Sequence, residues 1–330
     1  MNNAIHGQIR ELLTNAHRIL VVSHIRPDGD AIGSLLGLGL ALQAAGKDVQ
    51  MVLADGVPRN FRHLPGSNQV ERQAKGEFDC TAILDCSDLE RTGGVLKDRP
   101  ANLCIDHHIT NLNFAKINCV YPTAVSTSSI LAEHLGGWGL PITQPVAAAL
   151  LTGIISDTLG FRTSNMTPDA LRQAATLMEL GADLPELYNL ALVGRSFESI
   201  RYWGQGLERV QREGTLVWTA LTLEDRKVAT YPGNDDADLV NLLSTVDDSD
   251  IVVMFVEHSG NRVKVSWRAR PGWDVSKIAL QFGGGGHSAA AGAEITGSLA
   301  EVQEQVLQVT RAALNSSPRN NHAGRVSAAE

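Results

Sequence analysis

The sequence predicts an α/β protein with two domains: a doubly wound, mainly parallel sheet, then a helical connector and a smaller α/β domain. Three observations predict this class. Up to about Asn165, short β-branched runs alternate with helical stretches. A long helical stretch follows, and new strand-like runs begin near Thr215. The chain has 330 residues, 43% of them hydrophobic, which is enough for two moderate cores.

The first domain is predicted from an ordered series of short runs. They are "RILVVSH" (18–24), "VQMVLA" (49–54), "CTAILDC" (80–86) and "LCIDHH" (103–108), which alternate with stretches at 31–45, 126–135 and 146–155. Such alternation predicts a sheet with helices on both faces, and ligands then bind outside the carboxyl ends of the strands. His24, Asp85 and the segment 106–108 fall at these ends.

From Thr167 to about Arg212 the pattern is helical, with Thr167 as the predicted cap and Pro168 in the first turn. The second domain is predicted from "TLVWTALT" (215–222), a helical stretch at 236–246, and a hairpin of 250–258 and 261–270. The predicted boundaries are 1–190 for the first domain, 191–214 for the connector, 215–315 for the second domain and 316–330 for a disordered tail.

The overall charge and the cysteines limit the class of protein. A formal charge of −8 argues against a broad basic surface for long nucleic acids, although a small anionic ligand is compatible with it. The N-terminus lacks an apolar export segment, and the apolar stretch at 31–46 is too short to span a membrane. Four cysteines without a CxxC pair indicate buried thiols in a reducing cytoplasm. The oligomeric state is left open, with a homodimer as one option.

Six ionisable residues lie near the ends of the predicted runs and form the candidate site. They are His24, Asp28, Asp30, Asp85, His107 and Asp157. A single aspartate at a strand end is commonly a helix cap, so the prediction depends on the whole set. Four carboxylates in one cleft would repel each other, and two divalent cations would balance their charge. Oxygen and nitrogen ligands without thiolate favour Mn²⁺, with Mg²⁺, Co²⁺ or Zn²⁺ as alternatives.

The segments "SHIRPDGDAIGS", "LDCS", "CIDHH" and "TGIISDTLGF" resemble the four ordered motifs of the DHH phosphoesterase superfamily. The resemblance covers about residues 18–161. It implies that the six residues are metal ligands and that Asp85 bridges two ions. It also implies that His108 contacts the phosphate and that Asp106 orients the histidine pair, so the expected catalytic residues are His108, Asp85 and Asp106.

The segment "FGGGGHSAAAG" (282–292) is dense in glycine, so its backbone N–H groups can approach an anion, and its alanines would admit tight helix packing. It resembles the GGGH motif of the DHH-associated C-terminal domain. The substrate-binding residues expected from this resemblance are Gly284, Gly285, Gly286, His287 and, in the preceding strand, Arg268. Arg262 and Arg270 lie nearby, so the arginine assignment is less specific than the loop.

Together the two domains resemble the nanoRNase group of oligoribonucleases and phosphoadenosine-phosphate phosphatases. The expected function is two-metal-dependent hydrolysis of short oligoribonucleotides to mononucleotides, with removal of the 3′-phosphate of phosphoadenosine phosphate as a second activity. Hydrolysis of linear or cyclic dinucleotide signals is the alternative, since it needs the same motifs. A non-catalytic nucleotide-binding protein is disfavoured because all six ligands are present, and inorganic pyrophosphatase because the second domain carries a GGGH loop in place of clustered basic residues.

Overall fold

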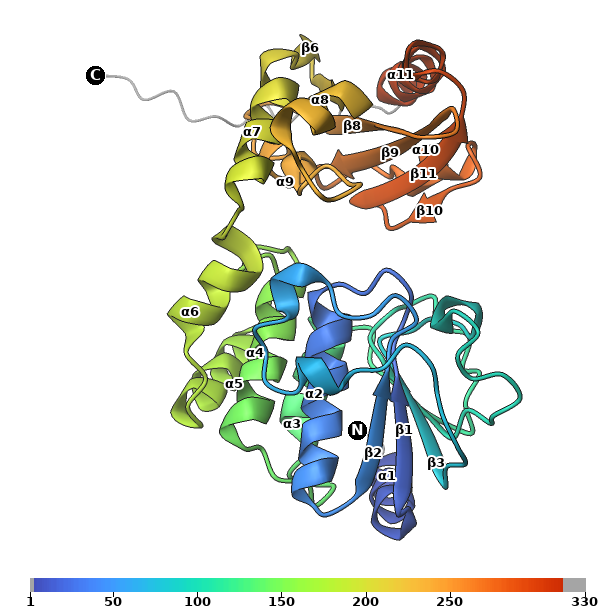
Figure 1. Cartoon of the computed structure of the whole chain (residues 1–330), viewed down its shortest axis with the longest axis vertical. Coiled ribbons are helices and arrows are strands. Elements are labelled where there is room, and N and C mark those ends of the chain that lie inside the picture. Colours follow the sequence, from blue (N-terminus) through green and yellow to red (C-terminus); the bar gives the residue numbers. More distant parts are fainter. Residues whose placement is uncertain (1–2, 317–330) are drawn as a thin grey trace. The chain divides into compact units, whose positions relative to one another are not determined.

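All five strands of the N-terminal sheet are parallel, in the order β2-β1-β3-β4-β5. Figure 1 shows β2, β1 and β3 side by side. They are β1 (Arg18–Val22), β2 (Asp48–Val52), β3 (Cys80–Leu84), β4 (Leu103–Asp106) and β5 (Ile117–Val120). This computed structural model describes residues 3–316 and divides the chain into two units, Met1–Gly194 and Arg195–Glu330. The sheet belongs to the first unit. Strand β5 is short and only partly buried, and the sequence pattern did not predict it.

In the first unit, one helix precedes the strands, one lies between β1 and β2, and the others follow β5. They are α1 (Asn3–Asn15), α2 (Gly29–Ala44), α3 (Thr127–His134), α4 (Gln144–Asp157), α5 (Pro168–Glu179) and α6 (Leu184–Tyr188), with a π-helical turn at Asn189–Val193 and 3₁₀ turns at Arg59–Phe61, Ser67–Gln69 and Glu90–Thr92. The Thr167 hydroxyl accepts the N–H of Ala170, which confirms the predicted cap of α5.

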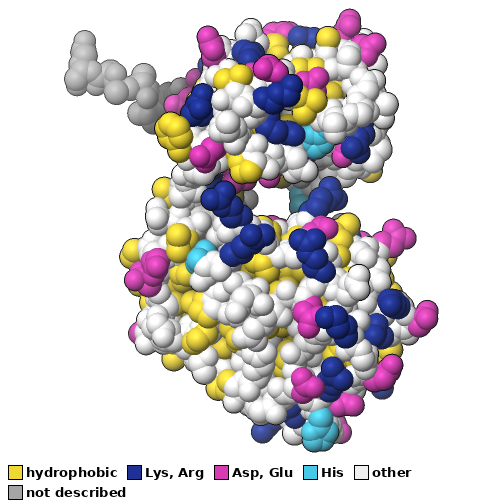
Figure 2. Space-filling view, viewed as in Figure 1, with side chains coloured by type: hydrophobic (Ala, Val, Ile, Leu, Met, Phe, Trp, Pro, Cys, Tyr) yellow, Lys and Arg dark blue, Asp and Glu magenta, His cyan; other side chains and the backbone are white. Residues whose placement is uncertain are grey.

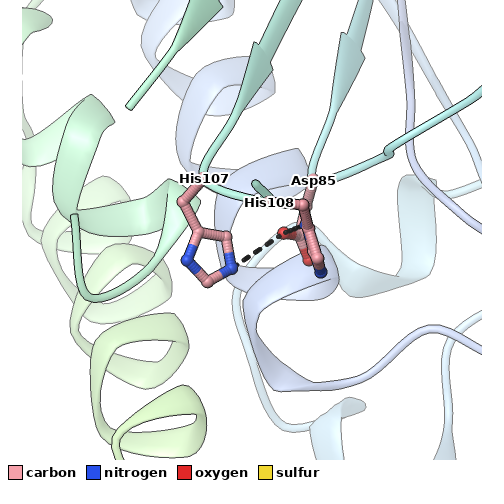
Figure 3. A group of neighbouring side chains, drawn as sticks. All are labelled: Asp85, His107 and His108. Carbon is pink, nitrogen blue, oxygen red and sulfur yellow. Dashed lines mark ion pairs between the residues drawn. The ribbon is translucent and has the colours of Figure 1, made fainter. Parts of the chain in front are cut away.

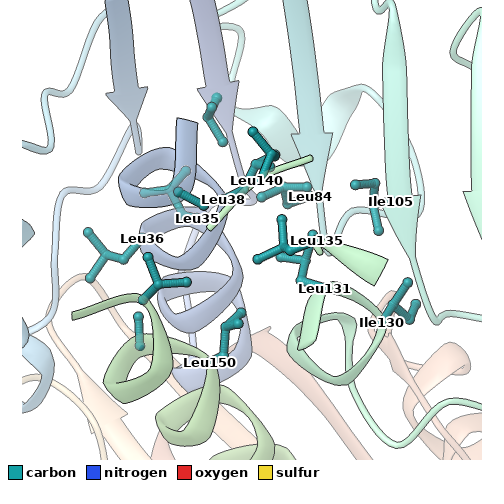
Figure 4. Packing of buried hydrophobic residues seen from close by; sticks show 14 of the residues in the cluster. Leu35, Leu36, Leu38, Leu84, Ile105, Ile130, Leu131, Leu135, Leu140 and Leu150 are labelled. Carbon is teal, nitrogen blue, oxygen red and sulfur yellow. The ribbon is translucent and has the colours of Figure 1, made fainter. Parts of the chain in front are cut away.

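The main hydrophobic core lies between one face of the sheet and helices α1 to α4 (Figure 4). Helices α2 and α4 pack at very short range, since a Cβ atom on Gly33 would lie 2.6 Å from the carbonyl oxygen of Ala149. The other face carries a smaller cluster that includes Leu20, Val22 and Ile83. None of the described members of that cluster lies in an α-helix, so loops cover this face in place of the predicted helices.

The second unit contains a mixed six-stranded sheet in the order β10-β11-β9-β8-β7-β6, in which only β7 and β8 pair in parallel. Its strands are β6 (Gln211–Glu213), β7 (Leu216–Leu221), β8 (Ile251–His258), β9 (Arg262–Ala269), β10 (Gly285–Gly286) and β11 (Ala290–Thr296). Its helices are α7 (Phe197–Glu208), α8 (Leu223–Ala229), α9 (Leu239–Leu243), α10 (Ser276–Leu280) and α11 (Leu299–Ser316). The α/β class of both units is therefore confirmed.

Three predictions for this unit need correction. The helical stretch does not reach Arg212, because residues 211–213 form an edge strand paired with β7. The helix expected at 236–246 is reduced to the five residues of α9. The alanines after His287 do not pack between helices, because Ala290 and Ala291 begin strand β11. The predicted β8–β9 hairpin is confirmed, with antiparallel pairing from Ile251↔Ala269 to His258↔Arg262.

Other predictions concern the cysteines, the membrane and the tail. Cys80, Cys86, Cys104 and Cys119 are all buried and free, as predicted. Within residues 3–316 no helix has the length and the apolar character needed to cross a membrane. The predicted disordered tail lies outside the described residues, except for Ser316 at the end of α11.

Candidate metal centre

The register of the sheet brings the predicted site residues to one edge. Val22 pairs with Ile83 and Leu84 pairs with Ile105, so strands β1, β3 and β4 end at about the same level. His24 follows β1, Asp85 follows β3 directly, and Asp106 is the last residue of β4. The side chains that leave these ends converge, as Figure 3 shows for Asp85, His107 and His108.

Asp85 lies in the middle of this group. Its backbone adopts a left-handed conformation with φ 53°, which aspartate tolerates better than most residues. Its N–H still donates to the carbonyl of Ile105 at 3.0 Å, so the turn remains attached to β4. The side chain is 1% exposed, and its two oxygens face opposite partners: Oδ2 lies 3.5 Å from Nε2 of His24, and Oδ1 lies 3.6 Å from Nε2 of His107.

The start of helix α2 supplies two carboxylates. Asp28 is the N-cap, and its Oδ1 accepts the N–H groups of Asp30 and Ala31 at 3.1 and 3.0 Å. Asp30 follows in the first turn and is buried. Both carboxylates therefore lie at the N-terminal end of α2, where backbone N–H groups point toward them. The same Oδ1 of Asp28 lies 3.9 Å from Nε2 of His24, so the cap also faces the cluster.

Helix α3 holds the buried carboxylate of Asp30 with its own N-terminus. Asp30 Oδ2 accepts the N–H of Thr127 at 2.6 Å, and Oδ1 accepts the N–H of Ser128 at 2.9 Å. The Thr127 hydroxyl donates to Oδ1 of Asp85 at 3.0 Å. Thr127 therefore contacts two predicted ligands, and the sequence analysis did not name it. The capping pattern from Ser126 to Ser129 indicates the helix start, but not the carboxylates it faces.

Asp157 reaches the cluster from the last residue of α4, not from a strand end as expected. Its Oδ2 lies 3.6 Å from Nε2 of His107. One turn earlier, a Cβ on Gly153 would lie 2.0 Å from Oγ of Ser128 and 2.8 Å from Oδ1 of Asp30. Only glycine at this position lets α4 approach the N-terminus of α3, which brings Asp157 next to the other carboxylates.

Backbone carbonyls determine which nitrogen each imidazole presents to the cluster. Nδ1 of His24 lies 2.9 Å from the carbonyl oxygen of Ile25, and Nδ1 of His107 lies 3.4 Å from that of Ala124. A carbonyl only accepts, so in both rings Nδ1 carries the proton and donates it. Nε2 of each neutral ring then presents its lone pair toward Asp85, as a metal ligand does.

Asp106 is fully buried behind the two histidines. Its Oδ1 accepts the N–H of His107 at 2.8 Å and lies 2.7 Å from Nδ1 of His108. Its Oδ2 accepts from the side-chain amide of Asn111 at 2.6 Å. Asp106 thus contacts both histidines, as the sequence analysis expected of an orienting residue, and Asn111 is a further member of this network that the sequence analysis missed.

The cluster carries more negative charge than its imidazoles balance. Burial and the charge of Asp85 raise the pKa of Asp30 to about 7. Burial and the charge of Asp30 raise the pKa of Asp157 to about 8. Burial opposes protonation of His107, but the carboxylates outweigh it and raise that pKa to about 9. Because these groups hold protons near neutral pH, a cation that binds to them would displace those protons.

Three overlapping sets of donor atoms could each hold a metal ion, with the atoms of each set within 4.8 Å of one another. The sets are His24, Asp28 and Asp85; Asp85, His107 and His108; and Asp30, His107 and Asp157. All donors are oxygen or nitrogen, which fits a divalent cation such as Mn²⁺ or Mg²⁺ better than a thiolate-bound metal. All six predicted ligands therefore belong to this network, and Asp85 belongs to two of its sets.

The predicted substrate-binding residues lie together in the second unit. Arg268 on β9 pairs with Ala290 on β11, and Ala290 exchanges backbone hydrogen bonds with His287 across a tight turn. A Cβ on Gly284 would lie 2.2 Å from the carbonyl oxygen of Gly292, so strand packing requires this glycine. Gly285 is exposed with open space around it.

Packing also requires Gly286, which has φ 142° and would place a Cβ 2.5 Å from the carbonyl oxygen of Ala290. Arg268 is partly buried, and its Nε donates to the side chain of Asn241 at 3.2 Å. Burial lowers the pKa of Arg268, against the opposing effect of Asp236 and Asp238. The arginine is therefore held by the fold and does not extend into solvent as an ordinary surface side chain.

Carboxylate and imidazole side chains gather at the carboxyl edge of a parallel sheet in this chain. This arrangement identifies the chain as an α/β protein with a candidate site for divalent cations. Two family descriptions match the chain: "DHH family, N-terminal domain" over residues 18–154 and "DHHA1 domain" over residues 229–316. The chain belongs to the DHH family of phosphoesterases.

Individual proteins support this family assignment. The chain is 38% identical over 299 residues, 89% of each protein, to the bifunctional oligoribonuclease and PAP phosphatase NrnA of Thermus thermophilus. It is 30% identical, over 71% of this chain and 73% of the relative, to a probable manganese-dependent inorganic pyrophosphatase of Streptococcus agalactiae. An exopolyphosphatase-related protein of Bacteroides fragilis superposes with a TM-score of 0.87 at 25% identity, covering 95% of this chain and 96% of that one.

Proposed function

We propose that this protein is a two-metal-dependent phosphoesterase that hydrolyses short oligoribonucleotides to mononucleotides and removes the 3′-phosphate of phosphoadenosine phosphate. One observation carries the proposal: Asp85 belongs to two sets of donor atoms at once, on opposite oxygens. A shared carboxylate is the arrangement that two neighbouring cations need. The 38% identity to a protein named for both activities supports the substrate class.

His24, Asp28 and Asp85 would hold one ion. The two sets that share His107 would hold the other, through Asp85, Asp30, His107 and Asp157. Divalent cations bound there would lower the pKa of a coordinated water and neutralise charge on the phosphoryl group. Other residues of the chain would orient the metal ligands and contact the substrate. Thr127 and Ser128 fix the orientation of Asp30 and, through the Thr127 hydroxyl, that of Asp85. Asp106 orients His108, which we propose contacts the phosphate of the substrate.

We propose Mn²⁺ as the preferred ion because the donors are mixed oxygen and nitrogen atoms. The relative named as a manganese-dependent pyrophosphatase supports the choice. We propose the cytoplasm as the compartment, on the basis of four buried free thiols.

We propose that the second unit binds a nucleotide of the substrate through Gly284, Gly285, Gly286, His287 and Arg268. The turn at His287 is exposed, and Arg268 is held next to it in the sheet register. The preference for short substrates rests on charge. Basic and acidic side chains are interspersed on the face drawn in Figure 2, and the net charge is −8. Long RNA draws most of its affinity from many basic contacts, so further nucleotides would gain little from this protein.

A length series of 5′-labelled RNAs under single-turnover conditions in Mn²⁺ tests the proposal. We expect kcat/KM to be highest for about two to four nucleotides and to fall steeply beyond about five. Phosphoadenosine phosphate, linear and cyclic dinucleotides and inorganic pyrophosphate complete the panel. Efficiency that stays level or rises with RNA length would contradict the short-substrate proposal. Faster turnover of cyclic dinucleotides than of linear diribonucleotides would favour the signalling alternative.

A further inference from the structure

The guanidinium of Arg268 is held at two of its three nitrogens. Nε donates to Oδ1 of Asn241 at 3.2 Å, and Nη1 donates to the carbonyl oxygen of Trp267 at 3.0 Å. Two hydrogen bonds on one planar group fix the direction in which its other N–H groups point. Trp267 directly precedes Arg268, so it is Asn241 on α9 that attaches the guanidinium to another element. Within residues 3–316 the third nitrogen, Nη2, forms no hydrogen bond and can donate to a ligand.

Neither hydrogen bond neutralises the charge of Arg268. Burial lowers the pKa of Arg268, and the charges of Asp236 and Asp238 oppose this effect, so both carboxylates lie within electrostatic range. Both are engaged elsewhere: Asp236 accepts the N–H of Val240 at 2.9 Å, and Asp238 lies 3.3 Å from Nη2 of Arg195. An amide oxygen can orient an arginine and leave its charge for an anion, whereas a carboxylate in the same place would compete with that anion.

The backbone that carries Asn241 into α9 is unusual and well supported. Ala237 and Asp238 have φ angles of 52° and 66°, which residues other than glycine rarely adopt. Side chains hold this turn, because Trp203 Nε1 donates to the carbonyl of Ala237 at 3.0 Å and Asp235 Oδ1 accepts the N–H of Ala237 at 3.0 Å. The N–H of Asn241 donates in turn to the carbonyl of Asp238 at 3.0 Å. Such conformations persist where the surroundings determine them, and they cluster at ligand sites.

We propose that Asn241 is a positioning residue of the substrate-binding site in the second unit, where its Oδ1 orients Arg268 so that Nη2 donates to the substrate nucleotide. This inference rests on the proposed function, in which Arg268 binds a nucleotide. Without the amide oxygen of Asn241, Arg268 would keep its charge and lose its fixed orientation. The main consequence should be weaker binding of the nucleotide, because the second unit contributes none of the proposed metal ligands.

Exchange of the Arg268 Nε–H proton with water tests the contact without any need for activity. A ¹H–¹⁵N spectrum of the arginine side chains of the full chain in Mg²⁺ reports this proton, and its absence in Arg268→Lys assigns the signal. Asn241→Leu removes the acceptor at similar volume and should speed the exchange by about tenfold or more. Asn241→Asp keeps an oxygen that can accept, so the proton should remain protected.

Steady-state kinetics tests the consequence for the substrate. Asn241→Leu should lower the ratio of kcat/KM for a diribonucleotide to kcat/KM for a small activated phosphodiester by about tenfold, mainly through KM of the diribonucleotide. Asn241→Asp should lower this ratio less than Asn241→Leu does. In an Arg268→Lys background, Asn241→Leu should change the ratio by less than about twofold, because a residue that acts through Arg268 has nothing left to orient.

Ser244→Ala is the matched control, since it removes a hydroxyl that donates to the backbone carbonyl of Asn241 at 2.7 Å. It should leave the ratio within about twofold of wild type. An equal fall in Ser244→Ala, or losses from Asn241→Leu and Arg268→Lys that add, would overturn the proposal in favour of a structural role. Equal Nε–H exchange in wild type and Asn241→Leu would overturn it too. A wild-type chain that cleaves no diribonucleotide would instead contradict the proposed function, and the exchange rate would then decide whether Asn241 holds Arg268.

Discussion

Replacing Thr127 by valine removes one hydroxyl from the edge of the metal centre with almost no change of shape. The hydroxyl donates to Asp85 at 3.0 Å, and both residues are at most 1% exposed. A hydrogen bond to a charged group contributes about 1.5–3 kcal/mol, and loss of a group that orients a ligand lowers metal affinity by about 10- to 100-fold. The N–H of Thr127 still reaches Asp30 in the variant, so we expect the lower end of that range, about tenfold.

Isothermal titration of chelator-stripped protein with Mn²⁺ measures this affinity directly, and steady-state kinetics on a diribonucleotide follows its effect on kcat. Thr127→Ser keeps the hydroxyl and should bind Mn²⁺ within about twofold of wild type. Thr152→Val is the matched control, because Thr152 is also buried but its hydroxyl donates to Ala148 within α4. Wild-type affinity in Thr127→Val, or an equal loss in Thr152→Val, would refute the argument that Thr127 orients Asp85.

The other predictions concern the shared ligand, pH and the second unit. Loss of a group that orients a ligand lowers metal affinity or activity by up to about 100-fold, and Asp85→Asn should reduce the rate of hydrolysis by more than that. Wild-type turnover in this variant would contradict the assignment of Asp85 as the shared metal ligand. In the metal-free folded protein the pKa of Asp157 is raised from its ordinary value of 3.8 to about 8, and that of His107 from 6.5 to about 9. The folded state therefore binds protons more tightly than the unfolded state. The melting temperature in chelator should therefore fall as pH rises from about 5 to 9, and a rise would contradict the charge balance. His287→Ala and Arg268→Ala should lower kcat/KM on a diribonucleotide by about tenfold or more, with little effect on a small activated phosphodiester. Equal losses on both substrates would assign these residues a structural role.

The strand-end residues of the site were predictable because they follow short buried β-branched runs. The ends of parallel strands meet at one edge, so His24, Asp85 and His107 converge once the sheet is recognised. Asp157 was expected near a strand end, but it follows the helical stretch predicted at 146–155 and is the last residue of α4. Its proximity depends on the glycine contact at Gly153, which no local pattern reveals.

Two other features could not be predicted from the sequence: the hydrogen-bond partners of Asp30, and the loops that cover the second face of the sheet. Thr127 and Ser128 lie about a hundred positions from Asp30, and their capping pattern is explained locally without it. The described residues that cover the second face lie in irregular segments between strands, whose turns carry little periodicity. Helix α8 was not predicted either, although Thr222 and Asp225 form a capping box at its start.

The central claim is that Asp85 is shared by two divalent cations that the reaction requires. The most direct test counts Mn²⁺ per chain by elemental analysis after chelation and reloading, in parallel with release of nucleoside monophosphate from a diribonucleotide. We predict two ions per chain, with activity that is lost in chelator and returns on reloading, and fewer ions with little activity in Asp85→Asn. Full turnover by metal-free protein, or two ions and wild-type turnover in Asp85→Asn, would contradict the account.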